Sequence, residues 1–389
     1  MNSIPDSSCR APARTGLPVA VALLGMAIFA VTTAEFAVAG LIDGLARDLG
    51  VQVTAIGYLV SIYAAGMMLG GPVVVLVLAR LRERTALALV LAAFALAQLV
   101  AALAPGYPLL AASRFVQGFA GAAAFGLALS IGGRIAGPGR QGQAAARIMG
   151  GLMIGTVLGL PLATWAGTQV GWRGTFAGLA LVAALAALAV WRGVPGDDAR
   201  HDGAAATAAL RSPWLWAAFA TSFLLIGGTF AAFTYFVPLL RLLTGVPAAW
   251  IPPLLALYGL ATVVGNFACG RLSDRMGALP VQRAGLVVLV LALAAFALAA
   301  TVPALALSAL VAIGLTGVAL NPAMVARVMA IDGSPLVAAV HTAVISAGLL
   351  SGSALAGVAI EHTRSMAAAP WVGAAMAALA LASTLRVRG

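Results

Sequence analysis

The chain consists of long apolar runs separated by short polar connections. Runs of about 20 apolar residues are long enough for an α-helix to cross the hydrocarbon core of a membrane. The alternating strands of about ten residues that a membrane β-barrel would need do not occur. The sequence therefore predicts an all-α membrane protein with twelve transmembrane helices, at about 18–42, 54–78, 85–104, 107–133, 145–168, 174–193, 213–240, 251–270, 280–301, 303–325, 336–360 and 367–385.

The first six runs resemble the last six. A shift of 195 residues aligns Pro18 with Pro213, Gly70 with Gly265 and Arg80 with Arg275. A duplicated six-helix unit is typical of secondary transporters, whose substrates bind near the middle of the membrane between the two halves. We therefore expect two pseudo-symmetric six-helix bundles. The predicted parts are a tail at 1–17, a bundle at 18–193, a linker at 194–212, a bundle at 213–385 and a tail at 386–389.

Composition supports a membrane protein and excludes several other classes. Of the 389 residues, 62% are hydrophobic and 8% are charged, and the mean hydropathy is +1.06. Soluble domains contain about 25% charged residues. The net charge of +11 comes from short arginine clusters between apolar runs, which do not form the continuous basic face of a nucleic-acid-binding protein. Three scattered histidines, two cysteines and no nucleotide-phosphate loop favour neither an enzyme, nor a metal or other cofactor, nor ATP as energy source.

Arginine placement predicts the orientation of the chain in the membrane. Cytoplasmic loops carry an excess of basic residues, and 17 of the 22 arginines fall on one side of the predicted helices. Only Arg47, Arg173, Arg241 and Arg364 fall on the other side. We therefore expect a multi-pass protein of a bacterial inner membrane, with both tails and the linker in the cytoplasm.

Two ionisable residues of opposite sign stand inside apolar runs. Glu35 lies in the first run and Arg114 in the fourth. A charge at membrane depth costs about 2.5–3.5 kcal/mol on insertion scales, so such residues usually have a function. Each lies seven residues from the predicted outer end of its helix, which places both roughly 10 Å below the outer surface. They could share one chamber and move protons, or they could form a static buried ion pair.

The residues around Arg114 form a motif. Arg114, Gln117, Gly118 and Gly121 follow the spacing R-x-x-Q-G-x-x-G. Small residues at such spacing let two membrane helices approach closely. This motif resembles the fourth-helix motif of the drug:proton antiporters of the major facilitator superfamily. The resemblance implies the two-bundle fold of that superfamily and a role in proton transfer for Arg114.

A second motif, in the fifth run, is similar to one found in exporters of the same superfamily. It consists of Gly155, Gly159 and Pro161, and its Gly-Leu-Pro ending departs from the common Gly-Pro form. This variant resembles a subset that includes sugar, arabinose, nucleoside and chloramphenicol exporters. The first run is similar to the same subset in its Glu35-Phe36 pair and in the later Asp-Leu-Gly at 48–50.

The loop after the eighth run matches a third motif of the superfamily. The string G-R-L-S-D-R-M-G covers 270–277 and contains Arg271, Asp274, Arg275 and Gly277. The resemblance implies that these residues latch the outward-facing state. The corresponding loop of the first half has Ala79 in place of the aspartate, with Glu83 as the nearest acidic residue.

Together these features predict a proton-coupled exporter of small amphipathic solutes or drugs such as chloramphenicol, working as a monomer by alternating access. Its expected partners are the substrate, protons and the bilayer, and Glu35 would take a proton from outside. A sugar, arabinose or purine nucleoside exporter, a proton-coupled importer and a membrane receptor that transports nothing remain alternatives. The candidate substrate contacts are polar or aromatic residues in the runs: Thr32, Phe36, Phe233, Tyr235, Phe236, Asn266 and Asn321.

Overall fold

The computed structural model describes residues 19–77, 81–137, 140–195, 212–332 and 335–385. Every regular element in these ranges is a helix. The first half contains α1 (Val19–Leu49), α2 (Val53–Val77), α3 (Glu83–Ala102), α4 (Tyr107–Ala136) and α5 (Gln141–Gly193). The second half contains α6 (Pro213–Phe233), α7 (Phe236–Pro238), η2 (Leu239–Leu243), η3 (Ala248–Trp250), α8 (Ile251–Met276), α9 (Ala278–Leu298), α10 (Pro303–Thr316), η4 (Val318–Leu320), α11 (Asn321–Ile331), α12 (Pro335–Thr363) and α13 (Ala368–Leu385).

The predicted twelve membrane crossings are confirmed, although α5 supplies two of them. In the described residues, eleven helical stretches are long and apolar enough to span a membrane, and α10, η4 and α11 together form one of them. The 53 residues of α5 would extend about 80 Å, more than twice the thickness of the hydrocarbon core. Gly171 divides α5 into two spans, because its φ of 71° lies in the left-handed region that glycine tolerates.

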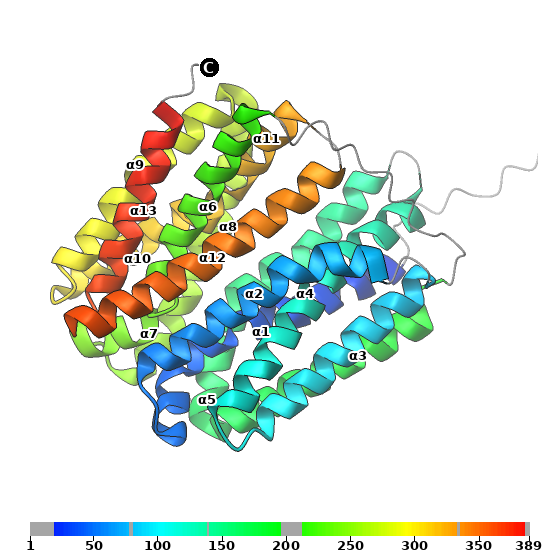
Figure 1. Ribbon diagram of the computed structural model, residues 1–389, viewed down its shortest axis with the longest axis horizontal. Coiled ribbons are helices and arrows are strands. Elements are labelled where there is room, and N and C mark those ends of the chain that lie inside the picture. The colour runs from blue at the N-terminus through cyan, green and yellow to red at the C-terminus, as the bar shows by residue number, and fades with distance from the viewer. Residues whose placement is uncertain (1–18, 78–80, 138–139, 196–211, 333–334, 386–389) are drawn as a thin grey trace, which may run out of the picture.

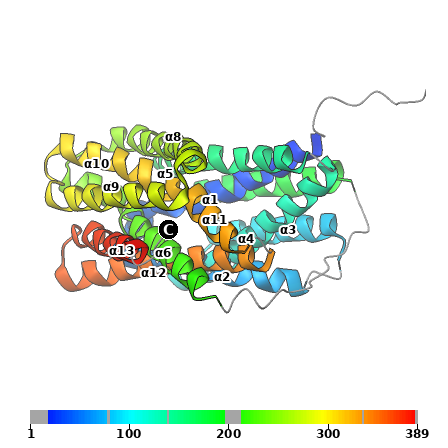
Figure 2. The same ribbon diagram turned by 90° about the horizontal axis from the view of Figure 1, so that it is seen from above.

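The helices form two groups that lie side by side. In Figures 1 and 2, α1–α5 gather on one side of the molecule and α6–α13 on the other. The two groups meet mainly where α12 packs against α2 and where α8 packs against α5. The exact domain limits stay a prediction. The tails at 1–17 and 386–389, and most of the linker at 194–212, lie outside the described residues.

Corresponding glycines in the two groups make corresponding contacts. A Cβ atom on Gly70 of α2 would lie 2.2 Å from the carbonyl oxygen of Phe119 in α4. A Cβ atom on Gly265 of α8 would lie 2.3 Å from the carbonyl oxygen of Leu315 in α10. Only glycine permits either approach, because a side chain would overlap the neighbouring backbone. The alignment of Gly70 with Gly265 in the sequence thus corresponds to a repeated helix contact.

Several helices depart from their predicted limits. α1 continues to Leu49, seven residues beyond the predicted end, so Glu35 lies in the middle of this helix rather than near its end. The predicted span at 213–240 is interrupted after Phe233, and the span at 303–325 is interrupted at Gly317. Gly317 is non-helical, and a Cβ atom there would lie 2.6 Å from the Thr229 side chain. The break at Gly317 therefore lies where α10 packs against Thr229 of α6.

Trp172 and Arg173 of α5 contact the Asp-Leu-Gly segment at the end of α1. The indole nitrogen of Trp172 donates a hydrogen bond of 2.9 Å to Asp48, and the guanidinium of Arg173 lies 3.8 Å from the same carboxylate. The Arg173 guanidinium also lies 4.0 Å from the centre of the Trp172 ring. The turn at Gly171 therefore fastens α5 to the end of α1.

Candidate functional site

Arg114 lies inside the first group of helices and is completely buried. Its Nη1 atom donates hydrogen bonds to the carbonyl oxygen of Ala34, at 3.1 Å, and to Oε1 of Gln117, at 2.7 Å. Its Nη2 atom donates to the carbonyl oxygen of Glu35, at 3.2 Å. Arg114 therefore binds the backbone of α1 at Glu35 and not the Glu35 side chain.

Two further contacts connect Arg114 to α2 and α3. The ring of Tyr63 in α2 lies 4.3 Å from the guanidinium carbon, measured to the ring centre. Gln117 in turn donates a hydrogen bond of 3.1 Å to the carbonyl oxygen of Ala97 in α3. The motif of α4 thus joins four helices of the first group through a single buried cation.

The Glu35 side chain is partly buried, and its carboxylate has no strong partner. No Arg114 nitrogen lies within 4.0 Å of it, and among the described residues it accepts no hydrogen bond. A carboxylate beside a buried cation, yet not bound to it, can gain or lose a proton without breaking an ion pair. The static ion pair that the sequence left open is therefore absent from this conformation.

The glycines of the two helix motifs lie in close helix contacts. A Cβ atom on Gly118 would lie 1.9 Å from the carbonyl oxygen of Tyr63. Cβ atoms on Gly155 and Gly159 would lie 2.9 Å from Cβ of Thr32 and 2.8 Å from Cα of Thr33, respectively. In this conformation Thr32 therefore packs between α1 and α5, which gives no support for its predicted place in a substrate cavity.

Pro161 affects the contact between the two groups. A proline in a helix has no amide hydrogen, so the carbonyl oxygen four residues earlier loses its usual partner. For Pro161 this is the carbonyl oxygen of Val157. This atom lies 3.1 Å from the Cβ position of Gly259 in α8. α8 thus approaches α5 at the carbonyl that Pro161 releases.

Aromatic side chains from both groups meet between α1 and α6. Phe36 lies 6.4 Å from Phe230 and 5.3 Å from Phe233, measured between ring centres. Tyr258 of α8 lies 5.5 Å from Phe233 and 5.2 Å from Phe236. All five rings are less than 10% exposed. This aromatic cluster, which contains three of the predicted substrate contacts, closes the space between the groups on the side of the α1–α2 connection.

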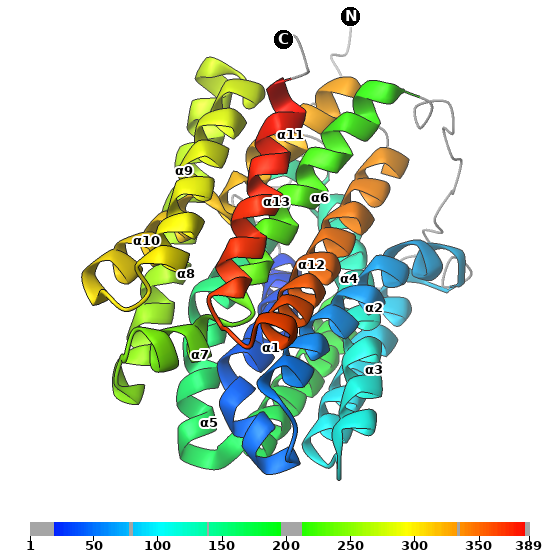
Figure 3. The ribbon, with the colours of Figure 1, turned by 60° about the vertical axis from the view of Figure 1, so that its left-hand side comes forward.

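Other contacts also join the groups at this end, which we call the closed end. Arg241 of η2 donates a hydrogen bond of 2.6 Å to Asp43 of α1. The hydroxyl oxygens of Ser61 in α2 and Ser353 in α12 lie 2.6 Å apart. In Figure 3, α7 lies beside α1 toward the lower end of the view, which is the closed end.

Tyr235 also lies at the closed end, at the break between α6 and α7, and it is fully buried. Its hydroxyl oxygen would lie 2.1 Å from a Cβ atom on Gly57 of α2 and 2.9 Å from one on Gly357 of α12. These two glycines make room for the tyrosine where the two groups meet.

At the opposite end, the motif at 270–277, predicted as a loop, instead forms the last turns of α8, and it is not latched. Arg271, Asp274 and Arg275 are exposed and form no ion pair with any residue that the structure describes, and Gly277 ends α8 with a φ of 86°. The other two predicted substrate contacts, Asn266 in α8 and Asn321 at the start of α11, are half-buried.

The hydrogen bonds at this end of the second group join helices of that group. Arg327, for example, binds Gln282 and Thr221.

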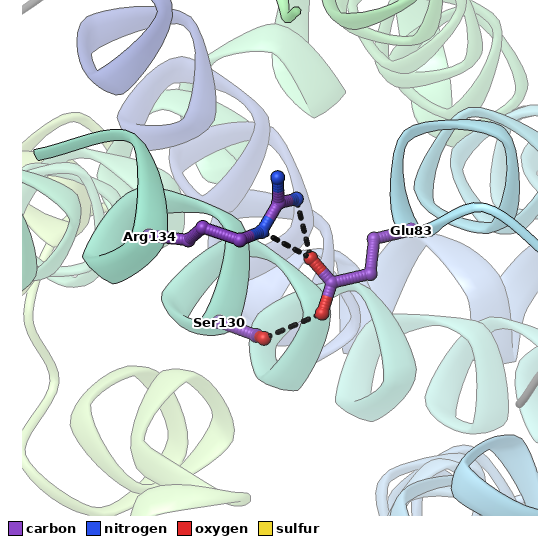
Figure 4. A network of polar contacts seen from close by, with 3 residues as sticks. All are labelled: Glu83, Ser130 and Arg134. Carbon is purple, nitrogen blue, oxygen red and sulfur yellow. Dashed lines mark hydrogen bonds and ion pairs between the residues drawn. The ribbon is translucent and has the colours of Figure 1, made fainter. Parts of the chain in front are cut away.

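Glu83 joins two helices of the first group at this end (Figure 4). It opens α3 and is 6% exposed. Its carboxylate accepts hydrogen bonds from Ser130, at 2.7 Å, and from Nη2 of Arg134, at 2.6 Å, both on α4. In this conformation Glu83 therefore fastens α3 to α4 within one half.

We expect Glu83→Gln to lower the free energy of unfolding by roughly 2 kcal/mol, because it weakens hydrogen bonds to a charged, buried group. Thermal unfolding of the purified protein in detergent measures this change. Asp274→Asn is the control, since that carboxylate is exposed and unpaired, and it should leave the unfolding temperature unchanged. An unfolding temperature of Glu83→Gln equal to that of the parent would contradict a stabilising role.

Comparison with known proteins agrees with this architecture. The chain belongs to the Major Facilitator Superfamily, whose family model matches residues 24–332. This places it among multi-pass membrane transporters rather than enzymes. It is 33% identical over 376 residues to a "Chloramphenicol resistance protein" of Streptomyces lividans, which covers 94% of this chain and 95% of that protein.

One further relative and one solved structure extend the comparison. The chain is 31% identical over 365 residues to the "Inner membrane transport protein YdhP" of Escherichia coli (strain K12), with 92% of this chain and 94% of that protein covered. The crystal structure of the nucleoside transporter NupG has a TM-score of 0.76 at 15% identity and covers 95% of this chain and 99% of that one. The second likeness shows the fold alone.

The sequence did not indicate several residues that the structure brings to the site. Tyr63, Ser61 and Ser353 lie inside apolar runs, where a tyrosine or serine is unremarkable without the partner helix. Asp43 and Arg241 carried a signal, because an acidic and a basic residue fall at the same predicted membrane surface. That signal was too general to pair them.

Proposed function

We propose that this transporter is a proton-coupled exporter of small amphipathic solutes. The observation that carries the proposal is the free carboxylate of Glu35 beside a buried guanidinium that is held by backbone carbonyls. In the proposed cycle the halves at 18–193 and 213–385 rock about the space between them. Glu35 takes up a proton from outside and releases it inward as substrate moves out.

The proton gradient would provide enough energy for export. Moving one elementary charge through 100 mV supplies about 2.3 kcal/mol. At 1.4 kcal/mol for each tenfold ratio, this supports roughly a fifty-fold gradient of a neutral solute. One proton for each substrate molecule is therefore sufficient.

The aromatic cluster and the relatives support the proposed substrate class. Phe36, Phe230 and Phe233 offer flat apolar surfaces where α1 and α6 meet. Such surfaces suit a solute with an aromatic ring and accept a range of shapes. A relative that is 33% identical over most of both chains is named for chloramphenicol resistance. Chloramphenicol is therefore the first compound to test.

The two ends of the molecule fit two stages of this cycle. With the orientation predicted from the arginines, the closed end faces outward and the unlatched end of α8 at Asp274 faces the cytoplasm. The structure then corresponds to an inward-facing stage. When the outer contacts open, the motif at 270–277, at the end of α8, would close against neighbouring helix ends and hold the outward-facing stage.

Transport into proteoliposomes tests the proposal. With an acidic interior, we expect radiolabelled chloramphenicol to accumulate inside as protons leave, and a protonophore to abolish the accumulation. Arabinose and a purine nucleoside serve as alternative substrates in the same assay. Substrate that moves in the same direction as the protons would indicate an importer, and uptake that ignores the gradient would contradict coupling.

A further inference from the structure

We propose that Tyr63 is a positioning residue for the coupling site, which holds the Arg114 guanidinium away from the Glu35 carboxylate through the face of its ring. This inference rests on the proposed proton coupling at Glu35. Tyr63 comes from α2, whereas Glu35 and Arg114 come from α1 and α4.

The Tyr63 ring lies against the Arg114 guanidinium. The guanidinium carbon of Arg114 lies 4.3 Å from the centre of the Tyr63 ring. Tyr63 is 1% exposed and Arg114 is fully buried, so no water weakens their attraction. The negative face of an aromatic ring attracts a cation most strongly in such a desolvated place. Within the described part of the chain no carboxylate lies within 4.0 Å of Arg114, so the ring supplies the attraction that a counter-ion would provide.

The hydroxyl group of Tyr63 does not explain why a tyrosine lies here. Its oxygen is buried and has no hydrogen-bond partner among the residues described here. A buried hydroxyl without a partner is unfavourable. The ring, rather than the hydroxyl, must therefore account for what Tyr63 contributes at this place.

Two motif glycines make room for this tyrosine. A Cβ atom on Gly118 would lie 1.9 Å from the backbone oxygen of Tyr63, and one on Gly121 would lie 2.8 Å from its hydroxyl oxygen. Both glycines belong to the same α4 motif as Arg114. The motif therefore supplies the cation and also the space for the ring that covers it.

The expected consequence follows from the hydrogen bonds of Arg114. The guanidinium binds the carbonyl oxygens of Ala34 and Glu35, while Tyr63 covers its face. Without the ring, the guanidinium is free to turn onto the Glu35 carboxylate and form a static ion pair. A carboxylate in such a pair would no longer take up and release protons during the cycle.

The test compares Tyr63→Phe with Tyr63→Leu in proteoliposomes, in assays of proton-driven accumulation and of substrate exchange without a gradient. Phenylalanine keeps the ring, so we expect accumulation within about twofold of the parent. Leucine removes it, so accumulation should fall at least about tenfold while exchange continues. Phe94→Leu is the matched control. Phe94 is fully buried in the same hydrophobic core as Tyr63 and lies 3.7 Å from the Gly121 Cβ position. It should behave as Tyr63→Phe does.

Accumulation by Tyr63→Leu at the parent level, or an equal loss in Tyr63→Phe, would overturn the inference. Should the leucine variant fail to fold, phenylalanines with increasing fluorine content at position 63 keep the shape and weaken the negative ring face. Accumulation should then decrease with each fluorine, and a flat response would overturn the inference. Coupling that survives Glu35→Gln would instead refute the proposed role of Glu35 as the coupling group, whatever Tyr63 does.

Discussion

Glu35→Gln is expected to abolish proton-driven accumulation and to leave substrate exchange active. Glutamine keeps the size and polarity of the side chain but cannot take up and release a proton. In the inside-acid proteoliposome assay, the parent should reach a ratio of substrate inside to outside of up to roughly fifty when the proton gradient is equivalent to 100 mV. In Glu35→Gln this ratio should fall to one. Exchange of labelled for unlabelled substrate needs no net proton movement and should continue.

Asp48→Asn provides the matched control for this variant. Asp48 lies on the same helix, and its side chain is 51% exposed and binds Trp172. The Asp48→Asn variant should keep the accumulation ratio within about twofold of the parent, because Asp48 lies far along α1 from the residues that bind Arg114. A Glu35→Gln protein that still accumulates substrate to the parent ratio would assign the coupling to another group.

The twelve crossings could be predicted because a membrane imposes a simple rule. A helix that crosses it must be apolar for about 20 residues, and this length is visible in the sequence. The same rule explains the error in α1. Hydropathy ends near residue 42, where Asp43 begins the polar stretch, but the backbone remains helical to Leu49. Hydropathy reports the edge of the bilayer, whereas the end of the helix depends on Gly50, whose φ is 64°.

The breaks in the second half could not be predicted in this way. The interruption after Phe233 brings Tyr235 between Gly57 and Gly357, which belong to helices distant in the sequence. Nothing near Tyr235 in the chain shows that these glycines face it. Only the packing of α2 against α12 makes this conformation favourable.

The coupling site was predicted at the level of residues but not of atoms. Two ionisable residues in apolar runs indicated that Glu35 and Arg114 lie near each other. The sequence could not show that Arg114 binds the carbonyl oxygen of Glu35 instead of the carboxylate. Backbone acceptors are present at every residue, so no side-chain pattern distinguishes them. Tyr63 was missed for a related reason, since an aromatic residue in an apolar run is usually a packing contact.

The second large effect is expected from a disulfide bond between the two halves at the closed end. Ser61 and Ser353 have hydroxyl oxygens 2.6 Å apart, on α2 and α12. We expect that the double variant Ser61→Cys, Ser353→Cys, in a chain with Cys9 and Cys269 replaced by serine, forms a disulfide on oxidation. Transport should then stop completely and return with a reductant, because alternating access requires the halves to separate here. The measurement is exchange and accumulation before and after reduction.

A disulfide within one half separates this effect from a general effect of cross-linking. The hydroxyl oxygens of Thr221 and Ser383 lie 2.8 Å apart on α6 and α13, both in the second half. The pair Thr221→Cys, Ser383→Cys should also form a disulfide, yet transport should continue, because helices of one half move together. If the oxidised Ser61–Ser353 pair transported as fast as the reduced form, the closed end would not open during the cycle. Substrate would then have to leave by another path, and the rocking of two halves would no longer describe this transporter.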